Sequence, residues 1–381
     1  MKVLNNYKAK QKGKTEMKNK MVRGLVVAGM VSMMLTACGS KETLGTADTE
    51  VTKTTDEQEE NTVPESAMET VEENVTKVDV ETENETTTAT QVEVLADVSR
   101  EEKIDIIIDE IKKRTAVEAY ELKIIEDTNP DIFDSKFGGL PYWDMSMEYP
   151  VDANQEKMML LAQINFSKAN LQDERLPQEG ILQFFISTND GMYGVDYENP
   201  DEQTNFRVIY HETIDESVTY EQIVAMDLPN AGEPQSVETP LTKEMEIEFC
   251  KTTSYMEPFI YGFEEVFQDI LMDRFGEDIG EQKSYEYVTD DEYAYIYDEI
   301  SNAGNRVLSY PFFTQYDPRD SMDEDKAEYY DTVLLQIDSY WNEKNEELIL
   351  WGDMGVANFF INSEALQNKD FSQVMYSWDC M

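Results

Sequence analysis

The chain has 381 residues, with 31 Lys and Arg against 80 Asp and Glu, and a formal net charge of −49 at pH 7. Such an acidic protein repels nucleic-acid phosphates and anionic lipid headgroups, which argues against a nucleic-acid partner. The charge favours cationic partners or, more simply, keeps the protein soluble. With a single histidine, His211, zinc sites built from several histidines are excluded, and any Ser-His-Asp triad would need that residue.

The first predicted element is a secretion signal over residues 1–37. Eight basic residues precede a short apolar run at 25–31, and Leu35-Thr36-Ala37-Cys38 follows. This order resembles a bacterial lipoprotein signal, and the apolar run is too short to span a bilayer. We therefore expect cleavage before Cys38, a palmitate-type lipid on that residue, and a location on the outer face of the cell membrane. A membrane-spanning anchor or a chance apolar stretch is the alternative. The start codon stays open among Met1, Met17 and Met21.

The second element, residues 38–98, is a predicted disordered tether. It is rich in Thr and Glu and has one proline. A segment of this composition buries too little apolar surface to offset the entropy of ordering, and its like charges extend it. We expect it to hold the folded part clear of the membrane, with a role as an interaction tail as the alternative.

The folded domain is predicted to begin at residue 99. Ser99 and Glu102 have the spacing of a capping box, and isoleucines then recur at helical spacing, which predicts a helix over residues 100–114. Short apolar runs separated by Gly, Pro and Asn-Asp-Gly follow to the C-terminus. They predict an α+β fold of mostly antiparallel strands with a few peripheral helices. Further strands are expected at 207–210 and 246–250, and helices at 262–273 and 291–302.

Two motifs recur in the same order along this domain. Residues 160–165 resemble 333–338, and residues 180–186 resemble 355–361; the offsets are 173 (163 to 336) and 175 (180 to 355). Nearly constant offsets predict a duplicated β-rich core of two similar halves. Chance similarity between apolar strands is the alternative. The predicted halves are about 135–200 and 305–381.

Several sequence blocks carry a family resemblance. They are Ser135–Tyr142, the block ending at Phe166, Leu176-Pro177 with Gly180–Ile186, Tyr310–Gln315, Asp317-Pro318-Arg319, Leu334–Ser339, Trp351-Gly352-Asp353 with Gly355–Ile361, and Tyr376–Cys380. In this order they resemble the YwqG-like family of uncharacterised bacterial proteins, domain of unknown function 1963. Leu308-Ser309, where the family commonly has glycines, and Tyr340, where an acid is usual, depart from its pattern.

The resemblance implies an α+β fold with a duplicated β-rich core and no established activity. It also implies an expectation about neighbours, because some relatives are suspected of acting as immunity proteins beside bacterial toxins.

The candidate binding residues are Gln163 and Asn165 on one expected strand and Gln336 and Asp338 on another. Residues two apart on a strand face the same side. If a pseudo-twofold relates the halves, both pairs would line a central groove that holds a peptide or a partner loop. The alternative is a buried hydrogen-bond network that fixes strand register.

Other constellations do not predict a catalytic residue, a metal or a cofactor. The loop at 317–325 and the loop at 127–131 are rich in oxygen ligands, but neither has the spacing of a calcium loop, and both are predicted to be solvated turns. No nucleophile elbow or phosphate-binding loop is present. Outside the cytoplasm a Cys250–Cys380 disulfide is permitted, although two cysteines make no framework.

The function predicted from these features is a lipid-anchored extracytoplasmic binding module. It would recognise a basic protein or peptide, such as a toxin, through its acidic surface. A carboxylate-dependent envelope hydrolase and a purely structural envelope lipoprotein are the alternatives.

Overall fold

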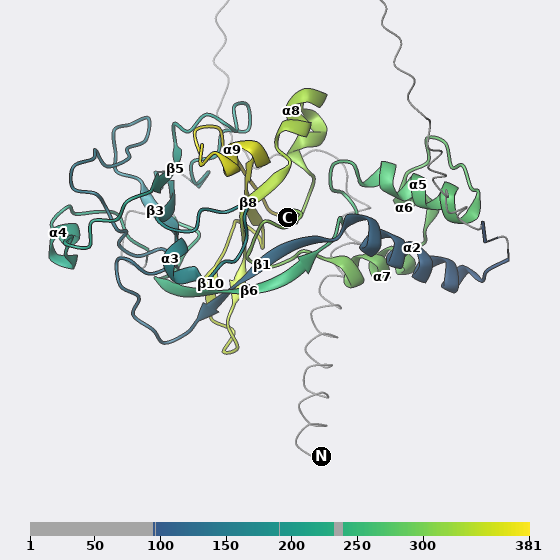
Figure 1. Ribbon diagram of the computed structural model, residues 1–381, viewed down its shortest axis with the longest axis horizontal. Coiled ribbons are helices and arrows are strands. Elements are labelled where there is room, and N and C mark those ends of the chain that lie inside the picture. Colours follow the sequence, from purple (N-terminus) through teal and green to yellow (C-terminus); the bar gives the residue numbers. More distant parts are fainter. Residues whose placement is uncertain (1–93, 96, 190, 232–238) are drawn as a thin grey trace, which may run out of the picture. The chain divides into compact units, whose positions relative to one another are not determined.

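The computed structural model describes residues 94–95, 97–189, 191–231 and 239–381 (Figure 1). The predicted signal, Cys38 and nearly all of the predicted tether lie outside the described residues. Within the described ranges, the structure has no helix with the length and hydropathy needed to cross a membrane.

A ten-stranded sheet is the centre of the fold, with strand order β12-β11-β8-β7-β1-β6-β2-β3-β4-β5. Every neighbouring pair is antiparallel, which confirms the mostly antiparallel α+β prediction. The strands are β1 (Val117–Ile125), β2 (Lys136–Phe137), β3 (Met159–Asn165), β4 (Ile181–Ile186), β5 (Phe206–His211), β6 (Met245–Ser254), β7 (Arg306–Val307), β8 (Thr332–Asp338), β11 (Val356–Ile361) and β12 (Met375–Asp379). A separate hairpin joins β9 (Tyr340–Trp341) to β10 (Glu347–Ile349).

The two ends of this sheet share one hydrophobic core. Phe184 on β4 and Phe359 on β11 are far apart in the strand order, yet their ring centroids lie 5.0 Å apart. Both belong to a core cluster that draws on β3, β4 and β5 and on β8, β11 and β12. The sheet therefore curves back on itself around this core.

Strand β3 is buried along its whole length because both of its faces are covered. Met159 and Leu161 face the main core, whereas Leu160 packs in a second cluster with Trp143 and Phe185. A strand covered on both sides needs apolar residues at successive positions instead of alternating ones. This explains the continuous apolar run that the sequence shows here.

Four helices lie together beside the far end of the β1–β6 pair, away from β3, β5 and α4 (Figure 1). They are α2 (Arg100–Thr115), α5 (Phe263–Phe275), α6 (Ser284–Tyr287) and α7 (Asp290–Ile300), which we call the helical layer. The predicted helices at 100–114, 262–273 and 291–302 are confirmed, although α7 ends at Ile300. The remaining helices described are α3 (Phe166–Ala169), α4 (Tyr220–Val224), α8 (Glu324–Tyr329), α9 (Ser363–Gln367) and the 3-10 turn η1 (Pro318–Ser321).

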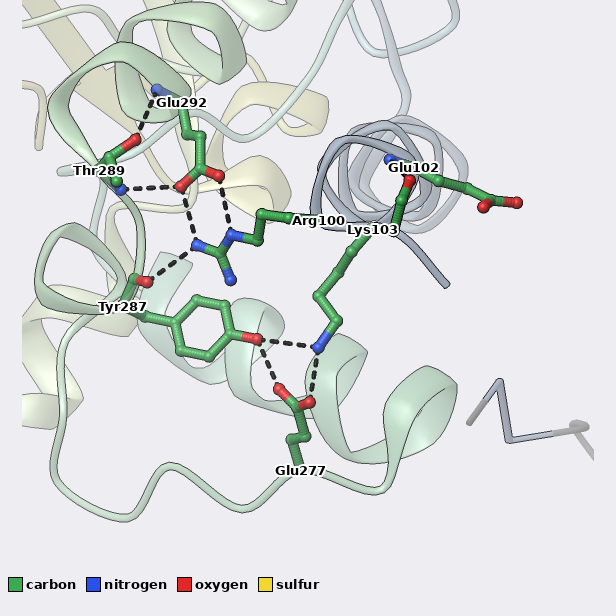
Figure 2. Close-up of polar contacts among 8 residues, drawn as sticks. Arg100, Glu102, Lys103, Glu277, Tyr287, Thr289 and Glu292 are labelled. Atoms are coloured by element: carbon green, nitrogen blue, oxygen red, sulfur yellow. Dashed lines mark hydrogen bonds and ion pairs between the residues drawn. The ribbon is translucent and has the colours of Figure 1, made fainter. Parts of the chain in front are cut away.

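Ion pairs fasten α2 to the rest of the helical layer (Figure 2). Arg100 donates from Nε and Nη2 to the two carboxylate oxygens of Glu292, at 2.7 and 2.8 Å, and Nη2 also donates to the Tyr287 carbonyl at 3.0 Å. Lys103 donates to Glu277 on the loop after α5. The Arg100 hydrogen bonds lower the pKa of Glu292 to about 2, so the pair stays ionised in neutral solution.

Candidate functional site

Gln163 holds two loops against β3 through both ends of its buried amide. Its Nε2 donates to the carbonyls of Ile132 and Asp134, at 2.8 and 2.9 Å. Its Oε1 accepts from the backbone N–H of Tyr142 at 3.0 Å and from Gln183 Nε2 at 2.7 Å. Buried backbone groups need partners, and this one side chain supplies three of them.

Gln336 makes the same kind of contacts on β8. Its Nε2 donates to the carbonyls of Asn302 and Gly304, at 2.8 and 2.7 Å, and its Oε1 accepts from the Phe312 N–H at 2.8 Å. In both places the two carbonyls are two residues apart and come just before a short strand, β2 or β7. That short strand pairs with the strand that carries the glutamine.

A second amide on the next strand completes each cluster. Gln183 on β4 donates to the Tyr142 carbonyl at 2.6 Å, and Asn358 on β11 donates to the Phe312 carbonyl at 2.9 Å. The loop residue that gives its N–H to a glutamine thus gives its carbonyl to an amide one strand further on. We call these sets the Gln163 cluster and the Gln336 cluster.

Asn165 and Asp338 extend the clusters to the ends of their strands. The N–H of Asn165 donates to Ser135 Oγ, and the N–H of Asp338 donates to Asn305 Oδ1, each at 2.9 Å. Asp338 Oδ2 also accepts from the Gly304 N–H at 2.8 Å.

The four predicted residues are therefore brought together in pairs, one pair in each cluster. Three of them are buried, Asp338 is partly exposed, and none of the four lines either of the two clefts described below. Their polar atoms serve mainly backbone groups, as the alternative of a buried network requires.

His211 ends the Gln163 cluster on β5. Its Nε2 lies 3.0 Å from Gln183 Oε1, and its ring meets the edges of Tyr142 and Trp143. The ring is 4% exposed, and this burial lowers its pKa to about 4. Since a buried imidazole is costly to charge, His211 is neutral at pH 7.

Glu257, which sequence reasoning missed, adjoins the Gln336 cluster. Its carboxylate accepts from the Asn302 N–H at 3.1 Å. The carbonyl of Asn302 in turn accepts from Gln336 Nε2. Glu257 is 2% exposed, and burial raises its pKa to about 8 although the charge of Arg306 acts in the opposite direction. An isolated Glu-Pro in a loop has no periodicity or motif that would have identified it.

The prediction of a solvated turn over residues 317–325 is wrong at Asp317 and Arg319, which are buried, although Asp320 and residues 323–325 are exposed. The Asp317 side chain is fully buried, ion-paired to Arg319 at 2.6 Å, and accepts from the Tyr261 N–H at 3.0 Å. The guanidinium also lies over the ring of Phe360, 4.9 Å from its centroid. Burial succeeds here because the carboxylate is both paired and hydrogen-bonded.

The other predicted loop and the cysteines are placed as follows. The side chains of Asp127, Asn129 and Asp131 are exposed, as a solvated turn requires. Among the described residues no group of His, Cys, Asp or Glu is arranged to hold a metal ion. Cys250 and Cys380 are free thiols, so the permitted disulfide is not formed.

A polar cleft of about 360 Å³ opens where β1 ends and β6 begins. Its lining includes three acidic residues, Glu126, Asp127 and Glu244, and one basic residue, Lys243. Glu126 accepts from Asn342 Nδ2 at 3.3 Å, and Glu244 accepts from Lys136 Nζ at 2.8 Å. Two of the three carboxylates are therefore already bound within the protein. A smaller cleft of about 260 Å³ lies between β6 and the end of α3.

The part of the helical layer that follows α2 carries a strongly acidic surface, whereas α2 itself has five acidic and five basic residues. Residues 262–300 contain 13 Asp and Glu against two Lys and Arg, and residues 99–381 contain 62 against 20. Most of these carboxylates are exposed. Glu265, Asp269, Asp273, Asp278, Glu281, Glu286, Asp290, Asp291, Asp298 and Glu299 are the exposed acids of this segment.

Comparison with known proteins gives one family. The family model described as a domain of unknown function, DUF1963, matches residues 135–380. The match begins after α2 and β1 and covers nearly all of the remaining chain. No curated protein matches the chain at a significant level.

Proposed function

We propose that this chain, which belongs to the DUF1963 family of domains of unknown function, is a binding module for a cationic protein or peptide. The observation that carries this proposal is the excess of carboxylates on the folded domain, which is dense over residues 262–300. Fields of this kind attract oppositely charged partners and accelerate their association. A toxin neutralised by this chain is one partner that would fit.

We place this module at the outer face of the cell membrane, held by a lipid on Cys38. The support is the sequence alone: basic residues, a short apolar run and Leu35-Thr36-Ala37-Cys38. Residues 38–98 would then separate the folded domain, residues 99–381, from the bilayer. Mass spectrometry of the native protein should find a diacylglycerol-modified Cys38 as the first residue. An unmodified N-terminal peptide upstream of Cys38 would contradict this placement.

We also propose that the two halves, 135–200 and 305–381, arose by duplication. The matched contacts of Gln163 and Gln336 support this. Gly138 and Leu308 add to it, because each follows its short strand with a positive φ, 63° and 58°. The N–H of each donates across to the neighbouring strand, to the carbonyl of Leu161 or Val333.

A hydrolase is the second candidate, since three acidic residues line the larger cleft. Glycoside cleavage needs one carboxyl as acid and another as base or nucleophile. Glu126 and Glu244 are instead held by Asn342 and Lys136, so a binding role is better supported. Asp127→Asn tests the alternative: loss of cell-wall degradation by the purified protein would favour it.

The binding proposal is tested by cross-linking in intact cells and mass spectrometry, followed by titration of the purified partner. We expect a basic partner whose affinity falls at least about tenfold between ~50 and ~300 mM salt. Glu265→Lys with Asp269→Lys on α5 should weaken binding more than the control pair Glu216→Lys with Glu221→Lys beside α4. All four residues are exposed and the net charge change is equal. A neutral or acidic partner, or binding that salt leaves unchanged, would contradict the proposal.

A further inference from the structure

An exposed aromatic pair stands on the helical layer. Phe259, on the loop between β6 and α5, is 43% exposed, and Tyr285 on α6 is 45% exposed. Their ring centroids are 6.5 Å apart with planes inclined by 31°, so the two rings form one surface. We call this pair the aromatic shelf. Neighbouring exposed rings of this size are unusual, because such side chains dominate cores and interfaces.

The backbone at Phe259 is strained. Its φ is +71°, in the left-handed region that a bulky residue rarely adopts. Strained residues persist where the surrounding structure fixes them, and they concentrate at ligand-binding positions. A glycine would remove the strain, yet the chain places a large aromatic ring there and directs nearly half of its surface to solvent.

A buried hydroxyl that lacks a hydrogen-bond partner in the described part of the chain lies next to the shelf. The Tyr293 ring is 5.4 Å from Phe259, its side chain is 2% exposed, and its hydroxyl has no hydrogen-bond partner among the described residues. Buried hydroxyls nearly always have a partner. The packing around the shelf therefore combines a strained backbone at Phe259 with a buried hydroxyl on Tyr293 that no described residue pairs.

Carboxylates border the shelf. Glu264 accepts from the N–H and hydroxyl of Ser284, the residue before Tyr285, and Glu286 is the residue after it. Lys283, next to Ser284, adds an exposed cation to this border. Two carboxylates against one ammonium group leave the border with a net negative charge.

We propose that the aromatic shelf, with its border of Glu264 and Glu286, is the docking surface for an arginine- or lysine-rich segment of the partner. This proposal rests on the proposed function and locates the surface that would bind the cationic partner. Aromatic faces attract guanidinium and ammonium groups, and the carboxylates add Coulombic attraction and select against acidic segments. The aliphatic part of a lysine or arginine side chain would cover the exposed rings.

The test uses the chain from residue 38 onward, titrated by calorimetry with acetylated hexa-arginine, hexa-lysine and hexa-glutamine peptides. We expect the cationic peptides to bind and hexa-glutamine not to bind. Phe259→Gly and Tyr285→Ala should each weaken hexa-arginine binding at least about fivefold. Tyr220→Ala is the matched control, because Tyr220 is 58% exposed on α4 and is followed by the exposed Glu221. This control should leave binding unchanged.

Denaturant unfolding separates docking from folding. Phe259→Gly relieves the left-handed strain, so its unfolding midpoint should not fall although its binding does. If hexa-arginine binds but Phe259→Gly and Tyr220→Ala have equal effects, the shelf is not the docking surface and the proposed function stands. If neither cationic peptide binds, the proposed function fails together with the shelf. A large loss of stability in Phe259→Gly would instead show that the ring serves folding.

Discussion

The Gln163 and Gln336 clusters satisfy the same backbone need and end in opposite chemistry. Each glutamine binds two loop carbonyls and one loop N–H. The first cluster then ends at His211, a base kept neutral by burial, and the second adjoins Glu257, an acid kept neutral by burial. The central amides are therefore fixed by the backbone groups that they bind, whereas the flanking positions are free to carry groups that titrate.

Replacing either glutamine should have the largest effect. Gln163→Leu and Gln336→Leu each remove the partner of three buried or partly buried backbone groups, at about 1–3 kcal/mol per group. We expect each variant to lose roughly 3–9 kcal/mol in urea unfolding, with Gln163→Leu losing more because Gln183 also loses its acceptor. Gln282→Leu, at an exposed position, is the control. A cost for Gln336→Leu no larger than that of the control would break the equivalence.

Glu257→Gln should show its effect at high pH. The native state holds the proton up to a pKa of about 8, whereas the unfolded state releases it near the ordinary value of 4.5. The unfolding free energy of the wild type therefore falls as pH rises from 4.5 to 8, whereas the variant lacks this fall because a glutamine side chain does not ionise. The difference in unfolding free energy should grow by roughly 3–5 kcal/mol across this window. A pH-independent difference would show that Glu257 is ionised in the folded protein.

His211→Gln should show the opposite trend at low pH. The native pKa is lowered to about 4 from an ordinary 6.5, so the unfolded state binds the proton first. Stability that is present above pH 6.5 is lost as pH falls to 4, by roughly 3 kcal/mol in the wild type and not in the variant. NMR can follow the single histidine directly. Titration of its ring near 6.5 would contradict the burial argument.

Arg100→Ala should have the smallest direct effect. Arg100 is 44% exposed, so losing its forked pair with Glu292 should cost about 1 kcal/mol, less in high salt. Hydrogen exchange in α2 should accelerate. The same variant tests whether the two clusters are independent. Loosening the helical layer should hydrate Glu257 and lower its pKa, while the pKa of His211 stays unchanged. Equal shifts at both groups would mean that the clusters are not independent.

Local sequence signals predicted the elements well. The isoleucine spacing identified α2, and Ser99 Oγ accepts from the Glu102 N–H, which is one half of the predicted capping box. Apolar runs located β3, β4, β8 and β11 because those strands are buried on both faces. Gln163 and Asn165 lie on one strand, β3, and Gln336 and Asp338 lie on another, β8, as predicted. The two-residue period of a strand fixes which side chains share a face.

Features that depend on distant segments could not be predicted. Asp317 looked like part of a solvated turn, because its acidic neighbours are exposed, but Tyr261 and Phe360 from other parts of the chain bury the pair that it forms with Arg319. Glu257 is buried by elements far along the chain. The strand order likewise joins segments separated by more than a hundred residues, which no local pattern encodes.

The place of β1 has a practical consequence for anyone preparing this protein. Strand β1 is fifth in the sheet and pairs along its whole length with β6 and at two positions with β7, although it precedes the residues matched by the family model. A fragment trimmed to residues 135–380 would lack the central strand and leave two bare edges. Such edges recruit strands from other molecules, so a trimmed product is expected to precipitate, and cloning boundaries should start ahead of Ser99.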